Sequence, residues 1–125
     1  MWTFSDEEME GISRPTEEVR GLPGTAYTSS EFFTLEEQNL FGTHWVCVGL
    51  EDEVPNPGDV QPVTAAGKSL FMMRDQTGKV NVFHNFCRHR GHRLVTGTCS
   101  VKGKLMCPYH SWDYGVRRRL FLSCV

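Results

Sequence analysis

The spacing of apolar and polar residues divides the chain into three stretches. Residues 1–27 mix acidic side chains with glycine and proline and show no sustained apolar period, which predicts an extended arm. Residues 28–41 (TSSEFFTLEEQNLF) place apolar residues on one face of a helix. Thr28 with Glu31 and Thr34 with Glu37 have the spacing of a capping box, so we predict one helix or two short helices in this segment.

Residues 42–125 contain short apolar runs separated by turn residues, a pattern typical of short β-strands. The runs SLFMMRD and KVNVFHN flank a Gln-Thr-Gly turn at 76–78 and predict a β-hairpin. The run VKGKLMC predicts a second strand pair around Gly103, and HWVCVGL predicts a buried strand that holds Cys47 in the core. Short strands at this spacing favour a small antiparallel sandwich or barrel. The predicted fold is therefore mainly β, preceded by a short helical segment.

Composition and charge exclude several classes of function. The 125 residues, 39% of them hydrophobic, suffice for one modest core, and 13 basic against 15 acidic residues give a net charge of −2. This balance offers no basic surface for nucleic acid or membranes, and no segment reaches the roughly 18 apolar residues of a membrane span. The acidic N-terminus is unlike a targeting peptide, and five cysteines, an odd number, argue against a disulfide framework. We therefore expect a cytoplasmic protein whose cysteines include metal ligands.

Two Cys/His pairs carry the candidate chemistry. Cys87 lies two positions before His89, Cys107 lies three before His110, and 17 residues separate the pairs. Each pair follows a predicted strand, so two adjacent loops could converge. Three interpretations are open: ordinary buried residues, a structural zinc site, or a [2Fe-2S] cluster with two cysteines on one iron and two histidines on the other. Only the cluster explains why each loop carries one ligand of each kind.

The four residues and their surroundings resemble a known family. Their pattern is similar to that of Rieske proteins, and FHNFCRHRG and CPYHSWDY resemble the large (alpha) subunits of Rieske non-heme iron oxygenases. The stretch LPGTAYTSSEFFTLEEQNLFGTHWVCVG resembles the approach to the Rieske domain in the quaternary-ammonium branch, which includes glycine betaine demethylases and choline monooxygenases. The resemblance implies a β-sandwich over residues 42–125 with two cluster-binding loops. It also implies one [2Fe-2S] cluster, with Cys87 and Cys107 on one iron and His89 and His110 on the other.

The resemblance further implies partners and supporting residues. Electrons would arrive from a flavin or ferredoxin reductase and leave toward a mononuclear iron in a catalytic domain or a neighbouring oxygenase subunit. Tyr114, Trp112 and Arg88 would surround the ligands, with Tyr114 hydrogen-bonded to the Cys107 sulfur. The sequence holds no Asp/Glu-x-x-His-x-x-x-His pattern for the mononuclear iron. No catalytic residue is therefore assigned, and whether this chain alone is an enzyme is left open.

Two rival functions stay open on the sequence. A stand-alone Rieske ferredoxin would carry electrons without belonging to an oxygenase, and a structural zinc module would be redox-silent. The segment GVRRRLFLSCV after Tyr114 departs from the Asp-Gly turn and Arg-Leu that the family places there. It predicts a truncated or atypical end of the β domain, which would leave a strand edge unpaired.

Overall fold

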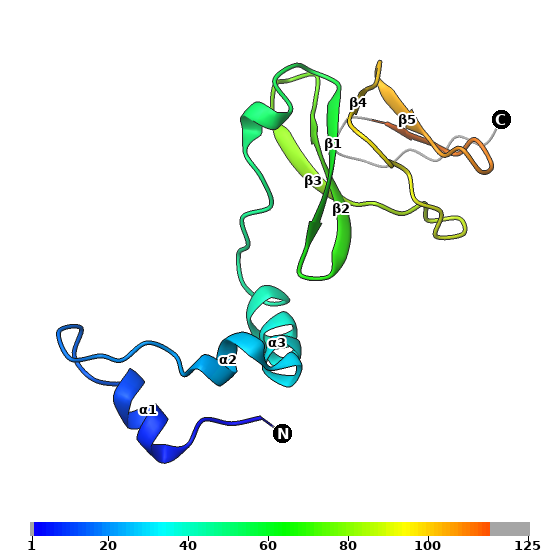
Figure 1. The fold of residues 1–125 in the computed structure, drawn as a ribbon. Helices are drawn as coiled ribbons and strands as arrows, with labels where there is room; N and C mark the ends of the chain where they lie inside the picture. Colours follow the sequence, from blue (N-terminus) through cyan, green and yellow to red (C-terminus); the bar gives the residue numbers. More distant parts are fainter. Residues whose placement is uncertain (1, 116–125) are drawn as a thin grey trace. The chain divides into compact units, whose positions relative to one another are not determined.

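The computed structural model describes residues 2–115 of the chain. The chain divides into two compact units, Met1–Trp45 and Val46–Val125, with the α-helices in the first and the strands in the second (Figure 1). The C-terminal segment that the sequence marks as atypical lies, from position 116 onward, outside the described residues. No helix among the described residues is long and apolar enough to cross a membrane.

The first unit consists of short helices. They are α1 (Asp6–Ile12), α2 (Gly24–Thr28), α3 (Ser30–Glu36) and the π-helical turn η1 (Glu37–Phe41). The predicted helical segment corresponds to α3 and η1, but its cap is Ser29 rather than Thr28, because the Ser29 side chain accepts a hydrogen bond from the Phe32 N–H at 3.1 Å. The arm predicted over residues 1–27 contains α1 and most of α2, and a capping box between Ser5 and Glu8 begins α1.

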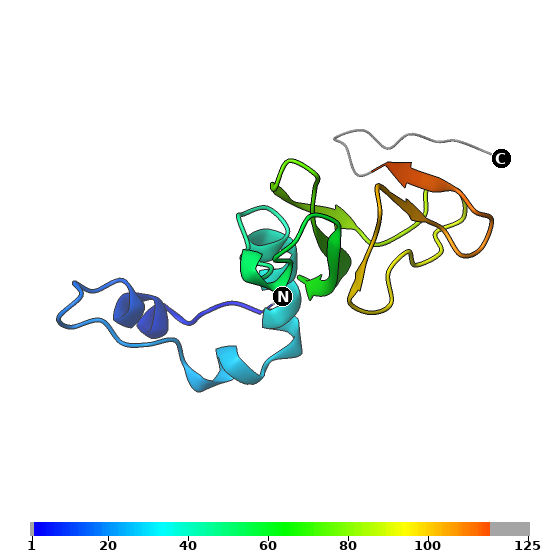
Figure 2. The ribbon, with the colours of Figure 1, turned by 90° about the horizontal axis from the view of Figure 1, so that it is seen from above.

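The second unit contains two antiparallel sheets, as the predicted fold class requires. One sheet has the strand order β3-β2-β1-β4 and the other pairs β5 with β6. The strands are β1 (Asp59–Ala65), β2 (Lys68–Arg74), β3 (Val80–His84), β4 (Cys99–Ser100), β5 (Lys104–Met106) and β6 (Asp113–Gly115), and the 3-10 turn η2 (Glu51–Glu53) precedes them. In both views the loop after β3 and the loop between β5 and β6 lie on the same side of this unit (Figures 1 and 2).

The hairpin predicted around residues 76–78 is confirmed as β2 and β3. Its turn depends on Asp75, which is only 8% exposed. The Asp75 carboxylate accepts hydrogen bonds from the backbone N–H groups of Thr77 and Lys79 and from the Thr77 hydroxyl. The hydrogen bond from the Thr77 side chain is the main cause that lowers the pKa of Asp75, so the carboxylate stays ionised and holds the turn.

Two other strand predictions are wrong. The run around Gly103 forms no strand pair, because β4 pairs with β1 whereas β5 pairs with β6. Gly103 has a φ of +85° and turns the chain from one sheet to the other. The run HWVCVGL forms no strand, and both Trp45 and Cys47 are exposed. This run spans the boundary between the two units at residues 45–46, where no sheet partner uses its β propensity.

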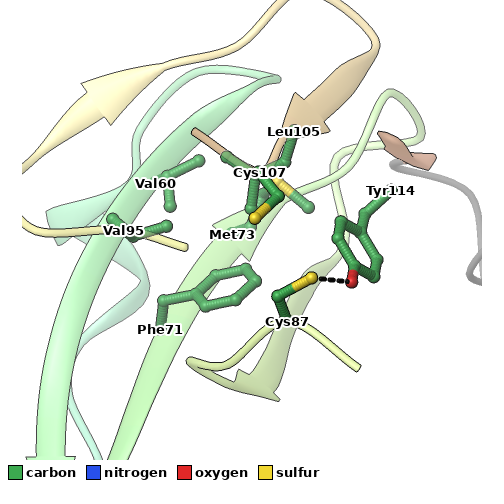
Figure 3. Packing of buried hydrophobic residues seen from close by; sticks show 8 residues of the cluster. All are labelled: Val60, Phe71, Met73, Cys87, Val95, Leu105, Cys107 and Tyr114. Carbon is green, nitrogen blue, oxygen red and sulfur yellow. Dashed lines mark hydrogen bonds between the residues drawn. The ribbon is translucent and has the colours of Figure 1, made fainter. Parts of the chain in front are cut away.

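The core of the second unit lies between its two sheets. It is formed by eight buried side chains: Val60, Phe71, Met73, Cys87, Val95, Leu105, Cys107 and Tyr114 (Figure 3). β1 and β2 supply one side of this cluster, and the β5–β6 hairpin supplies the other. Two of the eight are cysteines of the Cys/His pairs, so the core and the candidate site share residues.

Candidate metal centre

The first loop, residues 86–94, begins with a tight backbone turn. The Cys87 N–H donates to the His92 carbonyl at 2.7 Å, and the Gly91 N–H donates to the Cys87 carbonyl at 2.8 Å. Gly91 has a φ of +68°, a conformation that costs glycine little. This turn directs the Cys87 side chain into the core and leaves His89 at the surface.

The second loop, residues 107–112, repeats the same turn between β5 and β6. The Cys107 N–H donates to the Trp112 carbonyl at 2.8 Å, and the Ser111 N–H donates to the Cys107 carbonyl at 2.9 Å. Ser111 also has a positive φ, +57°, which is uncommon for a residue with a side chain. Each loop therefore sets one buried thiol and one exposed imidazole on a turn of the same hydrogen-bond pattern.

The thiols and imidazoles of the two loops form two pairs. Cys87 and Cys107 are 2% and 1% exposed and belong to one core cluster. The rings of His89 and His110 lie next to each other at the surface, with centroids 4.7 Å apart. Within residues 2–115, no three His, Cys, Asp or Glu side chains gather so as to hold a single metal ion. A two-iron cluster of the Rieske type takes two ligands at each iron.

Tyr114 links the two loops from within the core. Its hydroxyl oxygen lies 2.8 Å from the Cys87 sulfur and accepts a hydrogen bond from the Arg88 N–H at 3.0 Å (Figure 3). The predicted hydrogen bond of Tyr114 therefore forms with Cys87 rather than with Cys107. Burial, followed by this hydrogen bond, raises the pKa of Tyr114 to about 12, so the phenol stays protonated and can donate to the sulfur.

The electrostatics of the loops favour the protonation states in which these groups bind metals. Burial acts to raise the pKa of the Cys87 thiol, but hydrogen bonds from Tyr114 and from nearby backbone N–H groups outweigh it and hold that pKa below its usual value. Partial desolvation and then electrostatic interactions with His89, Arg90 and His92 lower the pKa of His110. A thiolate and a neutral imidazole are the ligand forms of these side chains.

The other predicted residues lie as follows. Trp112 is partly buried against the core and stacks on the His89 ring, with centroids 4.7 Å apart and an interplanar angle of 9°. Arg88 approaches Tyr114 through its backbone N–H, while the residue is otherwise exposed. Cys47 and Cys99 are exposed free cysteines, which corrects the prediction that Cys47 is a core residue.

One residue of this site was missed in the sequence analysis. Asn85, the residue after β3, is only 3% exposed and forms side-chain hydrogen bonds across the first loop. A signal was present, because Asn85 follows a predicted strand and precedes Cys87 by two positions. Burial of an amide side chain depends on tertiary structure, however, and asparagine is mostly exposed in proteins.

Comparison with known protein families gives a match over most of the second unit. The family described as the Rieske [2Fe-2S] domain matches residues 44–120. This range contains both loops and all the strands of the two sheets. It confirms the resemblance drawn from the two Cys/His pairs.

The similar curated proteins are large subunits of oxygenases. The chain is 38% identical over 104 residues to the large oxygenase component of salicylate 5-hydroxylase from Ralstonia sp, covering 82% of this chain and 25% of the relative. It is 36% identical over 102 residues to the oxygenase subunit of glycine betaine monooxygenase from Chromohalobacter salexigens, covering 82% of this chain and 23% of the relative. The chain thus spans about a quarter of the length of these relatives.

Solved structures show the same fold. A quaternary ammonium Rieske monooxygenase, whose structure is described in terms of carnitine oxidation by gut microbiota and inter-subunit electron transfer, matches with a TM-score of 0.70 and 33% identity. The match covers 80% of this chain and 27% of that one. The predicted β-sandwich and the predicted resemblance to Rieske oxygenase large subunits are confirmed, and the similar proteins include both a salicylate hydroxylase and quaternary-ammonium monooxygenases.

Proposed function

The chain belongs to the Rieske [2Fe-2S] domain family, and on this premise we propose that Cys87, His89, Cys107 and His110 hold the cluster. The cofactor of this domain is one [2Fe-2S] cluster, as the sequence predicted. Cys87 and Cys107 would bind one iron, and His89 and His110 the other. One observation carries this proposal: two loops with the same backbone turn set their thiols in one buried cluster and their imidazoles side by side.

The side chains around the four residues fit such a cofactor. When bound, a [2Fe-2S] cluster takes up and releases a single electron. Tyr114 would donate a hydrogen bond to one sulfur ligand and order the Arg88 backbone at the same time. Trp112 would fix the plane of the His89 ring by stacking on it. The buried cysteines would keep water from the sulfur side, while the exposed histidines would be accessible to a partner.

The proposed role is electron transfer within a Rieske oxygenase large subunit. The relatives named above are oxygenase components, which supports a path from a flavin or ferredoxin reductase through this domain to a mononuclear iron in a catalytic domain or a neighbouring oxygenase subunit. The two loops carry Arg88, Arg90 and Arg93 and no carboxylate, so an acidic patch on the electron donor would be attracted to them. In this role the domain would carry electrons toward that iron.

The proposed compartment is the cytoplasm. All four cysteines in the described part of the chain are free thiols, and two of them are proposed ligands. A reducing compartment keeps thiols available for iron, whereas an oxidising one favours disulfides.

Iron and acid-labile sulfide analysis, with EPR after dithionite reduction, tests the proposal on the 125-residue chain reconstituted without oxygen. We expect two irons, two sulfides and the rhombic signal of a Rieske centre. Cys107→Ser and His110→Ala should abolish this signal. Cys99→Ser and His44→Ala, which change exposed residues outside the two loops, should retain it. Folded protein that binds zinc without sulfide would instead support the zinc module.

A further inference from the structure

A buried side-chain amide lies at the base of the first loop, and it does not belong to the four proposed ligands. Asn85 is 3% exposed and directly follows β3. Its backbone N–H donates to the Ser69 carbonyl on β2 at 2.9 Å, so the residue is fixed to the four-stranded sheet. Whatever its side chain binds is therefore held at a set position relative to that sheet.

Both polar groups of the Asn85 side chain, its carbonyl oxygen and its amide nitrogen, form hydrogen bonds with the C-terminal end of the same loop. Its Oδ1 accepts from the N–H groups of Leu94 and Val95, at 3.1 and 2.8 Å. Its Nδ2 donates to the Val95 carbonyl at 2.7 Å. Val95 is itself only 3% exposed, so water cannot replace these bonds.

These hydrogen bonds close the first loop into a ring. Residues 86–94, which include Cys87 and His89, lie between the two points that the Asn85 side chain joins. The second loop needs no such device, because the pairing of β5 with β6 brings its ends together. The first loop has no strand pair across its base: β3 leads into it, and the next strand, β4, begins only at Cys99.

We infer that Asn85 is a positioning residue for the first loop, holding Cys87 and His89 where they can bind the cluster together with the second loop. This inference rests on the proposed function, because it takes Cys87 and His89 as ligands. Asn85 acts through the Leu94 and Val95 backbone and does not touch the cofactor. It makes the first loop a preformed half of the binding site.

Two Asn85 variants and a matched control test this inference in the 125-residue chain. Asn85→Ala removes all three side-chain hydrogen bonds to Leu94 and Val95. Asn85→Asp keeps the two accepting bonds but loses the donor and places a carboxylate oxygen against the Val95 carbonyl. Asn81→Ala is the control, since Asn81 lies on β3, the strand that Asn85 directly follows, and its side chain also makes hydrogen bonds, but to Asp75 and Lys79 near the opposite hairpin turn.

Three measurements separate positioning from general stability: the rate of iron loss to a chelator, the EPR spectrum of the reduced cluster, and hydrogen exchange at the Leu94 and Val95 amides. We expect Asn85→Ala to speed iron loss by about tenfold or more, as loss of residues that orient metal ligands generally does. It should also broaden the EPR spectrum and speed exchange at both amides. Asn85→Asp should lie between this variant and the unmodified chain, and Asn81→Ala should lower stability without changing the spectrum.

The outcomes distinguish this inference from the proposed function. If the unmodified chain binds the cluster and Asn85→Ala retains its spectrum and iron as well as Asn81→Ala does, the positioning role is wrong and the proposed function stands. If Asn85→Ala does not fold, the comparison of Asn85→Asp with Asn81→Ala decides in the same way. An unmodified chain that folds but binds no cluster overturns both.

Discussion

The two loops of the candidate metal centre share one backbone turn but are supported in different ways. In each, the cysteine N–H donates to the carbonyl five residues later, and the residue four positions after the cysteine has a positive φ. The second loop connects two paired strands, whereas the buried side chain of Asn85 closes the first. The backbone turn itself therefore shapes the site, and either a strand hairpin or a single side-chain amide can hold the loop closed.

The support of the second loop is the point where a substitution should have the largest effect. Leu105 lies on β5, is 6% exposed, and packs in the core two residues before Cys107. Leu105→Ala should lower the free energy of unfolding by about 2–5 kcal/mol, because it leaves a cavity beneath the hairpin. Urea denaturation measures this loss. Met106→Ala, on the same strand but 56% exposed, should change the midpoint little; equal losses would show that the hairpin is not anchored through Leu105.

The contact between the loops comes next in size. Tyr114→Phe removes the hydroxyl that meets the Cys87 sulfur and the Arg88 N–H. Loss of one such partner costs about 1–3 kcal/mol when a buried group is left unsatisfied. The reduction potential of the reconstituted chain should also fall, because hydrogen bonds to cluster sulfurs favour the reduced form.

Redox titration followed by EPR measures this potential. Tyr109→Phe is the matched control, since Tyr109 belongs to the second loop but is 56% exposed and contacts histidine rings instead of a sulfur. A potential that shifts equally in both variants would contradict a specific role for the Tyr114 hydroxyl.

The turn of the first loop gives a smaller effect. Gly91 has a φ of +68°, and a Cβ added there would meet no other atom within 4 Å. Gly91→Ala should therefore cost about 1–2 kcal/mol of backbone strain, offset by about 0.4–1 kcal/mol from the lower freedom of the unfolded chain. Gly97→Ala is the control, because Gly97 is equally open but has no positive φ. A midpoint in urea that is the same for both variants would show that the Gly91 turn is not needed for folding.

The spacing of the proposed ligands could be predicted from the sequence, but the contacts that hold the two loops closed could not. Two Cys/His pairs after predicted strands were enough to predict that two loops meet, and the structure brings the rings of His89 and His110 together. The choice of Cys87 over Cys107 as the partner of Tyr114 depends on how two sheets pack, which no local pattern records. The burial of Asn85 likewise depends on residues 94–95 returning to β3.

The strand errors have a similar physical origin. A run such as VKGKLMC has the residues of a hairpin, with a glycine between two apolar pieces. Only its second piece forms a strand, β5, which pairs with β6 and places Leu105 and Tyr114 in the shared core. The strand that pairs with β1 is β4, which ends at Ser100, just before the run begins. Local propensity therefore predicted the turn at Gly103 correctly, but it did not predict which strands would pair on either side of that turn.

The turn of the second loop allows the opposite kind of substitution, in which glycine replaces a residue that has a side chain. Ser111 has a φ of +57° where the first loop has glycine. Ser111→Gly should relieve about 1–2 kcal/mol of strain and lose about 0.4–1 kcal/mol to the greater freedom of the unfolded chain, for a net gain of up to about 1.6 kcal/mol. Urea denaturation should show the higher midpoint, and Ser111→Ala, which keeps the Cβ, should show little change. A lower midpoint for Ser111→Gly would mean that the serine side chain stabilises the loop, and the two turns would then be alike in backbone only.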